Sequence, residues 1–152
     1  MMIETPALDQ IKTHALSIFP EECCGFLLGT EQADDIRKIS VIREVNNAKT
    51  GDKKRRFEIT GKDYILAERF AQESGLLLLG IYHSHPGHPA IPSETDRLAA
   101  QPFFSYVIIS VIQGRIDHIR SWRLNETAAF DEEFFSPINT NQSISWLSLI
   151  HI

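Results

Sequence analysis

Apolar residues recur along the chain at two spacings, every three to four residues in some stretches and every second residue in others. The first spacing is typical of amphipathic helices, and the second of strands buried on one face. Helical spacing starts at Thr5-Pro6 and stops before Pro20, which predicts a capped amphipathic helix. A second helix is predicted between the capping box of Thr60 and Asp63 and the stop at Gly75.

Short apolar stretches bounded by turn residues predict the strands. These strands are predicted at 24–28, 36–45, 56–59, 76–82, 106–111, 115–124 and 128–133. The first is expected to close at Gly29. In the second, Ile39, Val41 and Val45 are expected to share one face, because side chains alternate along a strand. Strands interleaved with helices predict an α/β fold.

The chain has 152 residues, of which 43% are hydrophobic, and this is enough for one globular domain with a sizeable core. That domain is predicted to span residues 1–135. The Ser/Asn-rich stretch at 136–152 is expected to be a tail, either weakly ordered or packed on another subunit, as in a homodimer.

A net charge of −5 argues against a nucleic-acid partner. The one basic run, at 53–56, is interpreted as a solvated loop, with contact to an acidic protein as the alternative. Cys23 and Cys24 are adjacent, so they cannot build a disulfide framework. The pattern of a secretory signal peptide is missing, and the apolar runs are too short to span a membrane. A cytoplasmic protein without a membrane partner is expected.

A histidine pair follows the strand predicted at 76–82. His83 and His85 are separated by one residue, so on an extended backbone both rings point to the same side. After seven more residues comes Ser93, the predicted N-cap of a helix at 94–101, with Asp96 in its first turn. Two imidazoles and one carboxylate can hold a metal and leave one position open for water. That arrangement is typical of a catalytic zinc, so the sequence indicates a metal-dependent hydrolase.

Each of these residues also has an ordinary structural explanation. The histidines could form a buried, hydrogen-bonded pair at a strand end. Serine is a common N-cap, and the helix dipole alone favours an aspartate such as Asp96 in a first turn. The complete set at these spacings is what favours the metal site over the separate explanations.

The same residues resemble the motif of the JAMM (MPN+) metallopeptidases: an upstream Glu, then His-x-His, seven residues, Ser, two residues and Asp. Residues 83–86 and 93–96 match it position by position. The upstream Pro-x-Glu-x-Cys-Gly element of small prokaryotic members is similar to residues 20–25, where Glu22 rather than the neighbouring Glu21 stands in the motif position. The resemblance covers roughly 11–133. It is closest to the compact bacterial branch that acts on ubiquitin-like sulfur-carrier proteins.

The resemblance implies a mixed, curved β-sheet flanked by helices, with the cytidine-deaminase-like JAMM/MPN architecture and the metal at a sheet edge. It implies one Zn²⁺ per chain, bound by His83, His85 and Asp96 with water as the fourth ligand. Glu22 would be the general acid/base, and Ser93 would hydrogen-bond the oxyanion of the tetrahedral intermediate.

The function implied is a zinc peptidase or isopeptidase that cuts after the C-terminal Gly-Gly of a ubiquitin-like or sulfur-carrier protein. Release of an amino acid such as cysteine, or removal of a modifier from lysine side chains, would both use this chemistry. A phage-tail peptidase usually accompanies a second hydrolase domain, for which the chain has no room. A non-catalytic module of the same fold is the alternative of a different class, although the chain keeps every motif residue. A zinc nucleoside deaminase is disfavoured because its His-x-Glu and Pro-Cys-x-x-Cys elements are missing.

The other histidines and the cysteines have no ligand spacing. His88 lies in a proline-rich loop and is expected to be exposed or to face substrate. Cys24 is expected to be a small buried hydrophobe beside the site. Surface positions are expected for the remaining three histidines, which are His14, His118 and His151.

Overall fold

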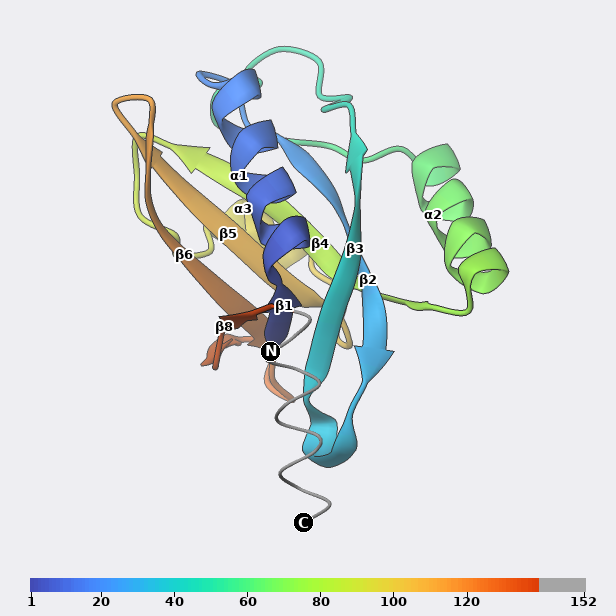
Figure 1. Cartoon of the computed structure of the whole chain (residues 1–152). Coiled ribbons are helices and arrows are strands. Elements are labelled where there is room, and N and C mark those ends of the chain that lie inside the picture. The colour runs from blue at the N-terminus through green and yellow to red at the C-terminus, as the bar shows by residue number, and fades with distance from the viewer. Residues whose placement is uncertain (140–152) are drawn as a thin grey trace.

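The computed structural model describes residues 1–139, which form one eight-stranded sheet with three α-helices (Figure 1). The strand order is β7-β6-β5-β4-β2-β3-β1-β8. The strands are β1 Met2–Glu4, β2 Cys24–Glu31, β3 Arg37–Val45, β4 Leu77–Pro86, β5 Ser105–Ile112, β6 Arg115–Leu124, β7 Phe130–Glu133 and β8 Ser136–Ile138. The helices are α1 Thr5–Ile18, α2 Gly61–Ser74 and α3 Glu94–Ala99, with a short 3₁₀ turn, η1, at Ala33–Asp35.

The sheet is mixed. β4 pairs parallel with β5, and β1 pairs parallel with both β3 and β8, whereas the remaining neighbours are antiparallel. The strands twist into the curved surface visible in Figure 1. The prediction of a mixed, curved α/β sheet flanked by helices is therefore confirmed.

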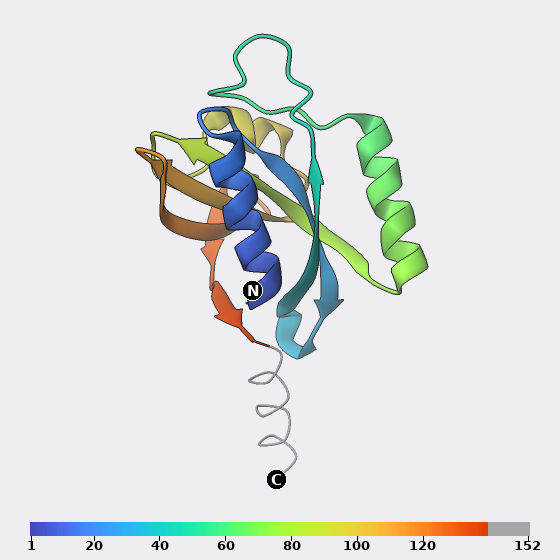
Figure 2. The same ribbon diagram turned by 45° about the horizontal axis from the view of Figure 1, so that its top comes forward.

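The two longer helices cover opposite faces of the sheet (Figure 2). Leu27 and Tyr82 belong to the core cluster that α1 helps to bury, whereas their sequence neighbours Phe26 and Ile81 belong to the cluster that packs with α2. This alternation is the period of two expected for strands buried on both faces. It places each residue of β2 and β4 on a defined side of the sheet.

Both long helices lie where the sequence predicts them, but only one has the predicted cap. Thr60 accepts a hydrogen bond from the Asp63 amide, and Gly75 ends α2 with φ at 68°. In α1 the N-cap is Glu4, which makes no side-chain cap bond. The Thr5 hydroxyl instead donates to the carbonyl of Ile138, because the start of α1 lies beside β8.

The strand predicted at 56–59 is wrong, since these residues form a loop. Their backbone groups bond to Asn47 and its neighbour instead of to a strand. The Asn47 side chain donates to the Arg56 carbonyl and accepts from the Glu58 amide, and the Ala48 amide donates to the Glu58 carbonyl. One amide side chain thereby substitutes for a strand partner. Figure 2 shows this loop extending beyond the sheet between β3 and α2.

The predicted common face of β3 is also wrong. Ile39 packs in the cluster on the α1 side, whereas Val41 and Val45 pack on the α2 side. The reason is an irregularity in the β2–β3 ladder, where Leu28 pairs with Val41 and the next residue, Gly29, with Ile39. An extra residue in one strand reverses the side to which its later side chains point. β2 also continues past Gly29 to Glu31.

Two strands were not predicted, β1 and β8, each of three residues. Three residues are too few for periodicity to reveal, and the two strands are fixed by pairing with each other and with β3. Ser136 to Ile138 therefore belong to the sheet, although the predicted tail began there. The rest of that predicted tail, residues 140–152, lies outside the described residues. Among residues 1–139, none of the helices is both long and apolar enough to cross a bilayer.

Candidate metal centre

The site is built where two central strands end beside each other. β2 and β4 are antiparallel, and Cys24 lies opposite His83. Continuing that register places Glu22, just before β2, beside His85. Because His83 and His85 alternate with Tyr82 and Ser84, they lie on the same face as Ile81, the face covered by α2. The metal site was predicted at a sheet edge. The structure places its residues where β4 ends and β2 begins, and these two strands lie in the middle of the strand order.

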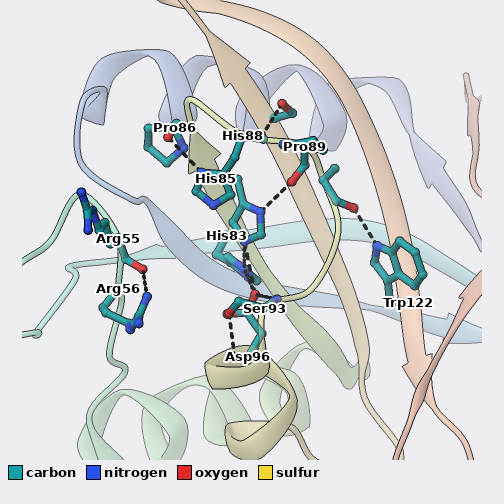
Figure 3. Close-up of polar contacts among 12 residues, drawn as sticks. Arg55, Arg56, His83, His85, Pro86, His88, Pro89, Ser93, Asp96 and Trp122 are labelled. Carbon is teal, nitrogen blue, oxygen red and sulfur yellow. Dashed lines mark hydrogen bonds and ion pairs between the residues drawn. The ribbon is translucent and has the colours of Figure 1, made fainter.

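The loop from β4 to α3 is anchored so that it turns back over the histidines. Hydrogen bonds fix the backbone carbonyls of three successive loop residues (Figure 3). The His88 carbonyl accepts from Ser110 Oγ at 2.7 Å, and the Pro89 carbonyl lies 2.8 Å from His85 Nδ1. The Ala90 carbonyl accepts from Trp122 Nε1 at 3.0 Å. The seven residues between His85 and Ser93 therefore form a fixed connection between strand and helix.

Asp96 is held by a reciprocal cap at the start of α3. The Ser93 amide donates to Asp96 Oδ2 at 2.9 Å, and the Asp96 amide donates to Ser93 Oγ at 3.1 Å (Figure 3). This is the capping box in which the third helical residue bonds back to the cap. It uses one lone pair of Ser93 Oγ for the helix and leaves the hydroxyl hydrogen without an acceptor among residues 1–139.

Three donor atoms converge on one point of the site. His83 Nε2 and His85 Nε2 are 3.2 Å apart, and Asp96 Oδ2 lies 3.3 Å from the first and 3.2 Å from the second. In a tetrahedral zinc site with bonds of about 2.0–2.1 Å, neighbouring ligand atoms are about 3.3 Å apart. The triangle therefore fits one face of a zinc tetrahedron, with the fourth corner left for water or substrate.

The contacts around the histidines orient the two rings. The carbonyl of Pro89 faces His85 Nδ1, so this nitrogen carries the proton and Nε2 presents its lone pair. His83 stacks against Phe57 with ring centroids 4.5 Å apart, and its Nδ1 has no hydrogen-bond partner within residues 1–139. His88 is exposed, as predicted, and stacks on His85 at 4.2 Å. Whether it faces substrate stays a prediction.

Two carboxylates adjoin the histidines, and their environments push their pKa values in opposite directions. Burial raises the pKa of Glu22 to about 8, and the negative charge of Asp96 adds to the effect while Arg56 opposes it. Burial alone would also raise the pKa of Asp96, but His83, the bonds from both histidines and the Ser93 amide outweigh it and hold that pKa far below the usual range. Asp96 is therefore ionised at neutral pH, and Glu22 holds a proton there.

This difference distinguishes the two possible ligand sets. A carboxylate oxygen of Glu22 lies within 4.8 Å of a ring nitrogen of each histidine, so Glu22, His83 and His85 could also hold a metal. Asp96 fits better, because its oxygen completes the 3.2–3.3 Å triangle and is ionised. Glu22 is suited to carry a proton beside the metal. Glu21, the rival in the sequence, is exposed.

The remaining histidines and the cysteines contribute no donor atom to this triangle. The predicted surface position is wrong for His14, which is buried with Nδ1 at 2.7 Å from the Tyr82 hydroxyl. A buried partner on the neighbouring strand satisfies its ring, which α1 carries into the core. His118 is half-buried, and its Nε2 accepts from the Ala90 amide. Cys24 is buried beside the site, as predicted, and Cys23 is a second buried free thiol. His151 lies outside the described residues.

Sequence reasoning missed the pocket next to the triangle. It has a volume of about 260 Å³ and is bounded by the 46–60 loop, α2, α3 and the sheet. Its lining residues are Lys49, Arg56, Phe57, Glu58, Ile59, Tyr64, Ile81, Thr95, Asp96, Ala99 and Tyr106. The stretch 56–59, which lines this pocket, has the apolar pattern of a strand and gives no sign of a pocket in the sequence. The basic run that ends at Arg56 is a solvent-exposed loop, as expected.

Comparisons with known proteins show what the whole chain is similar to. A model of the family described as prokaryotic homologs of the JAB domain matches residues 4–125. The chain is similar to the CysO-cysteine peptidase of Mycobacterium tuberculosis, with 26% identity over 140 residues that cover 91% of this chain and 90% of that protein. It is also similar to the desampylase of Haloferax volcanii, with 29% identity over 115 residues, 72% of this chain and 80% of that protein. A solved protein from Salinibacter ruber shares 39% identity and a TM-score of 0.71, covering 92% of this chain and 93% of its own.

Proposed function

The chain belongs to the family of prokaryotic homologs of the JAB domain, and from that premise we propose that it is a zinc-dependent peptidase. We propose that it hydrolyses the bond after the C-terminal Gly-Gly of a ubiquitin-like or sulfur-carrier protein. The observation that carries the proposal is the triangle of His83, His85 and Asp96 at 3.2–3.3 Å, with a protonated, buried glutamate beside it. This is the donor set and the proton carrier that metal-assisted hydrolysis of an amide requires.

His83, His85 and Asp96 would hold one zinc ion per chain. When bound, the ion would supply Lewis-acid chemistry and a water molecule of lowered pKa. The protein residues orient the reaction: the Pro89 carbonyl fixes the His85 ring, Phe57 supports the His83 ring, and the Ser93 cap fixes Asp96.

Glu22 would move the proton. Its pKa of about 8 is close to neutral pH, so it can both accept a proton from the attacking water and return one to the leaving amine. Burial at 2% exposure keeps bulk water from exchanging that proton during the reaction. General acid–base catalysis of this kind typically contributes about 10²–10⁴-fold in rate.

Ser93 would stabilise the oxyanion. Its oxygen already accepts from the Asp96 amide, so the hydroxyl hydrogen is available to the developing negative charge on the substrate. Loss of one such donor typically lowers kcat by about 10²–10³-fold.

The names of two relatives support the proposal that the substrate contains a carrier or modifier protein. One relative is named CysO-cysteine peptidase, which favours release of an amino acid from a carrier protein. The other is named desampylase, which supports a second candidate, removal of a small modifier from lysine side chains. The chain keeps every motif residue, so a non-catalytic interaction module is disfavoured.

The first experiment measures zinc per chain by elemental analysis and incubates the protein with Gly-Gly-terminated carrier conjugates. Near one zinc per chain, with cleavage after Gly-Gly that a chelator abolishes, supports the proposal. Zinc without cleavage of any conjugate contradicts the substrate, and no zinc after reconstitution contradicts the metallopeptidase itself.

We propose that the protein is cytoplasmic, and the state of its two cysteines supports this location. Both cysteines are free and buried, which suits a reducing cytoplasm.

We propose that residues 1–135 contain the whole catalytic unit. A homodimer formed through the tail at 136–152 remains a prediction that sedimentation of the full chain would test.

A further inference from the structure

Ala90, in the loop between β4 and α3, is held at both of its backbone groups by side chains of β6. The Ala90 amide donates to His118 Nε2 at 2.9 Å, and the Ala90 carbonyl accepts from Trp122 Nε1 at 3.0 Å, a bond that Figure 3 shows. His118 and Trp122 lie in a regular part of the β5–β6 ladder, so both side chains share one face of the sheet. Trp122 pairs with Tyr106 of the cluster on the α2 side, and the metal triangle lies on that face.

A carboxylate sets the tautomer of His118. Its Nδ1 lies 2.6 Å from Asp117 Oδ2, and because a carboxylate accepts, Nδ1 carries the proton. The other nitrogen, Nε2, then presents a lone pair. The Ala90 amide can only donate, so it requires the same tautomer. Two partners on opposite sides of the ring therefore agree on one state of His118.

The peptide group between Pro89 and Ala90 connects His118 to a proposed metal ligand. Its N–H donates to His118, and its carbonyl, that of Pro89, lies 2.8 Å from His85 Nδ1. The peptide is trans, so the N–H and C=O point in opposite directions and turn together as one rigid plane. The oxygen cannot turn away from His85 unless the bond to His118 breaks. Donation to His118 also polarises the carbonyl and strengthens its bond with His85.

We propose that His118 is a positioning residue for His85, that it acts through the Pro89–Ala90 peptide, and that Asp117 fixes its tautomer. The bond at Nδ1 keeps the His85 ring turned with Nε2 toward the other donor atoms. Partners of this kind orient a metal-binding imidazole and make it a better donor. The inference rests on the proposed metal centre and adds a residue from outside the family motif, which ends at Asp96.

Two substitutions of His118 separate its acceptor from its volume. His118→Leu keeps an apolar side chain of similar reach without an acceptor, whereas His118→Gln offers an amide oxygen near the position of Nε2. Loss of such a partner typically weakens metal binding by about 10–100-fold, so we expect this fall in zinc affinity for His118→Leu and its recovery in His118→Gln. Competition with a chromogenic chelator measures the affinity.

Arg120→Leu is the matched control. Arg120 lies two residues from His118 on the same face of β6, is exposed, and pairs with Glu132 instead of with the loop. The variant removes a long polar side chain and introduces the same leucine, but it leaves the bonds of Ala90 intact. It should bind zinc with the wild-type affinity.

The tautomer of His85 in the metal-free protein is a readout that a general loss of stability does not move. Proton–nitrogen NMR spectra at mildly alkaline pH show which ring nitrogen carries the proton. His118→Leu should lower the share of rings protonated at Nδ1, because Asp96 Oδ2, at 3.2 Å from Nε2, competes for that proton. His118→Gln should restore the share. Asp117→Ala changes an exposed side chain and should act in the same direction more weakly.

The outcomes separate the positioning role from the metal centre. A wild-type tautomer of His85 or a wild-type zinc affinity in His118→Leu overturns the role, and so does a loss that His118→Gln fails to restore. A wild-type protein that binds no zinc contradicts the proposed metal centre instead. The tautomer in the metal-free variants then decides the role of His118 by itself.

Discussion

Glu22 and Asp96 adjoin the same two histidines, yet the fold gives them opposite properties. Glu22 precedes a buried central strand, is 2% exposed and has its pKa raised to about 8. Asp96 lies in the first turn of a short helix with an 11% exposed side chain, and its pKa is held far below the usual range. The difference shows that hydrogen bonds and burial, rather than residue type, decide which carboxylate is ionised at neutral pH and which keeps its proton.

The contacts explain the contrast. Asp96 Oδ2 faces the Ser93 amide and both imidazoles, and these contacts stabilise negative charge. Glu22 is taken from water by the strands around it, and the nearby carboxylate of Asp96 adds repulsion. Four variants or conditions test this contrast, in order of decreasing effect.

Asp96→Asn should have the largest effect, because it removes a charged donor from the triangle. Zinc affinity is expected to fall by more than the ~10–100-fold that loss of a merely orienting partner costs, with activity lost alongside. Competition with a chromogenic chelator measures the affinity. His83→Ala should behave alike, and unchanged bound zinc in either variant would point to different ligands.

Glu22→Gln should keep the zinc and lose the chemistry. The amide has almost the shape of the protonated carboxyl but cannot shuttle a proton, so kcat should fall by about 10²–10⁴-fold with normal metal content. Single-turnover hydrolysis and elemental analysis on the same sample measure both. Turnover at the wild-type rate would remove Glu22 from the mechanism, and loss of zinc would make it a ligand.

The stability of the metal-free protein should report the raised pKa of Glu22. The folded state keeps a proton on Glu22 up to about pH 8, whereas the unfolded chain releases it near pH 4.5, the ordinary pKa of a glutamate. The stabilisation is therefore fully present below pH 4.5 and is lost as pH rises through 8. Between pH 5 and 8 the unfolding free energy of the wild type should fall by a few kcal/mol relative to that of Glu22→Gln. Urea titrations in the presence of a chelator measure both free energies. Parallel pH profiles of the two proteins would contradict the raised pKa.

Substitutions of Ser93 should have the smallest of these effects. They test whether its hydroxyl only caps α3 or also donates a hydrogen bond to the oxyanion. Ser93→Ala and Ser93→Gly both remove the hydroxyl, and each should lower kcat by about 10²–10³-fold. Glycine is a far better N-cap than alanine, which costs about 1 kcal/mol. Equal kinetic losses with unequal unfolding free energies would support the oxyanion role. Kinetic losses that follow stability would leave Ser93 as a cap alone.

The parts of the molecule that sequence predicted well are governed by neighbouring residues. Thr60, Asp63 and Gly75 specify both ends of α2 through bonds within a few residues. Ser93 with Asp96 specifies the start of α3, whereas this helix ends at Ala99 rather than at the predicted residue 101. The two-residue spacing of His83 and His85 places both rings on one face of an extended strand. Such features need no distant partner, so the local sequence is enough to predict them.

The predictions that failed depended on distant partners. Residues 56–59 have strand composition, but the side chain of Asn47 takes their backbone bonds. Ile39 and Val41 lie on opposite faces because β2 and β3 pair with an irregularity at Gly29. His14 is buried because Tyr82 offers it a hydroxyl across the core.

The sequence by itself determined the triangle of donor atoms on His83, His85 and Asp96, because the spacing from His83 to Asp96 lies within one strand, one loop and one capped helix. The motif register also identified Glu22 as the candidate proton carrier. Only the tertiary structure decided that Glu22 is buried beside the triangle with its pKa near 8, and that Lys49 and Arg56 line a pocket next to it. Burial and electrostatic potential are sums over residues far apart in the chain, so they exist only once β2 has paired with β4 and the 46–60 loop has closed over Glu22.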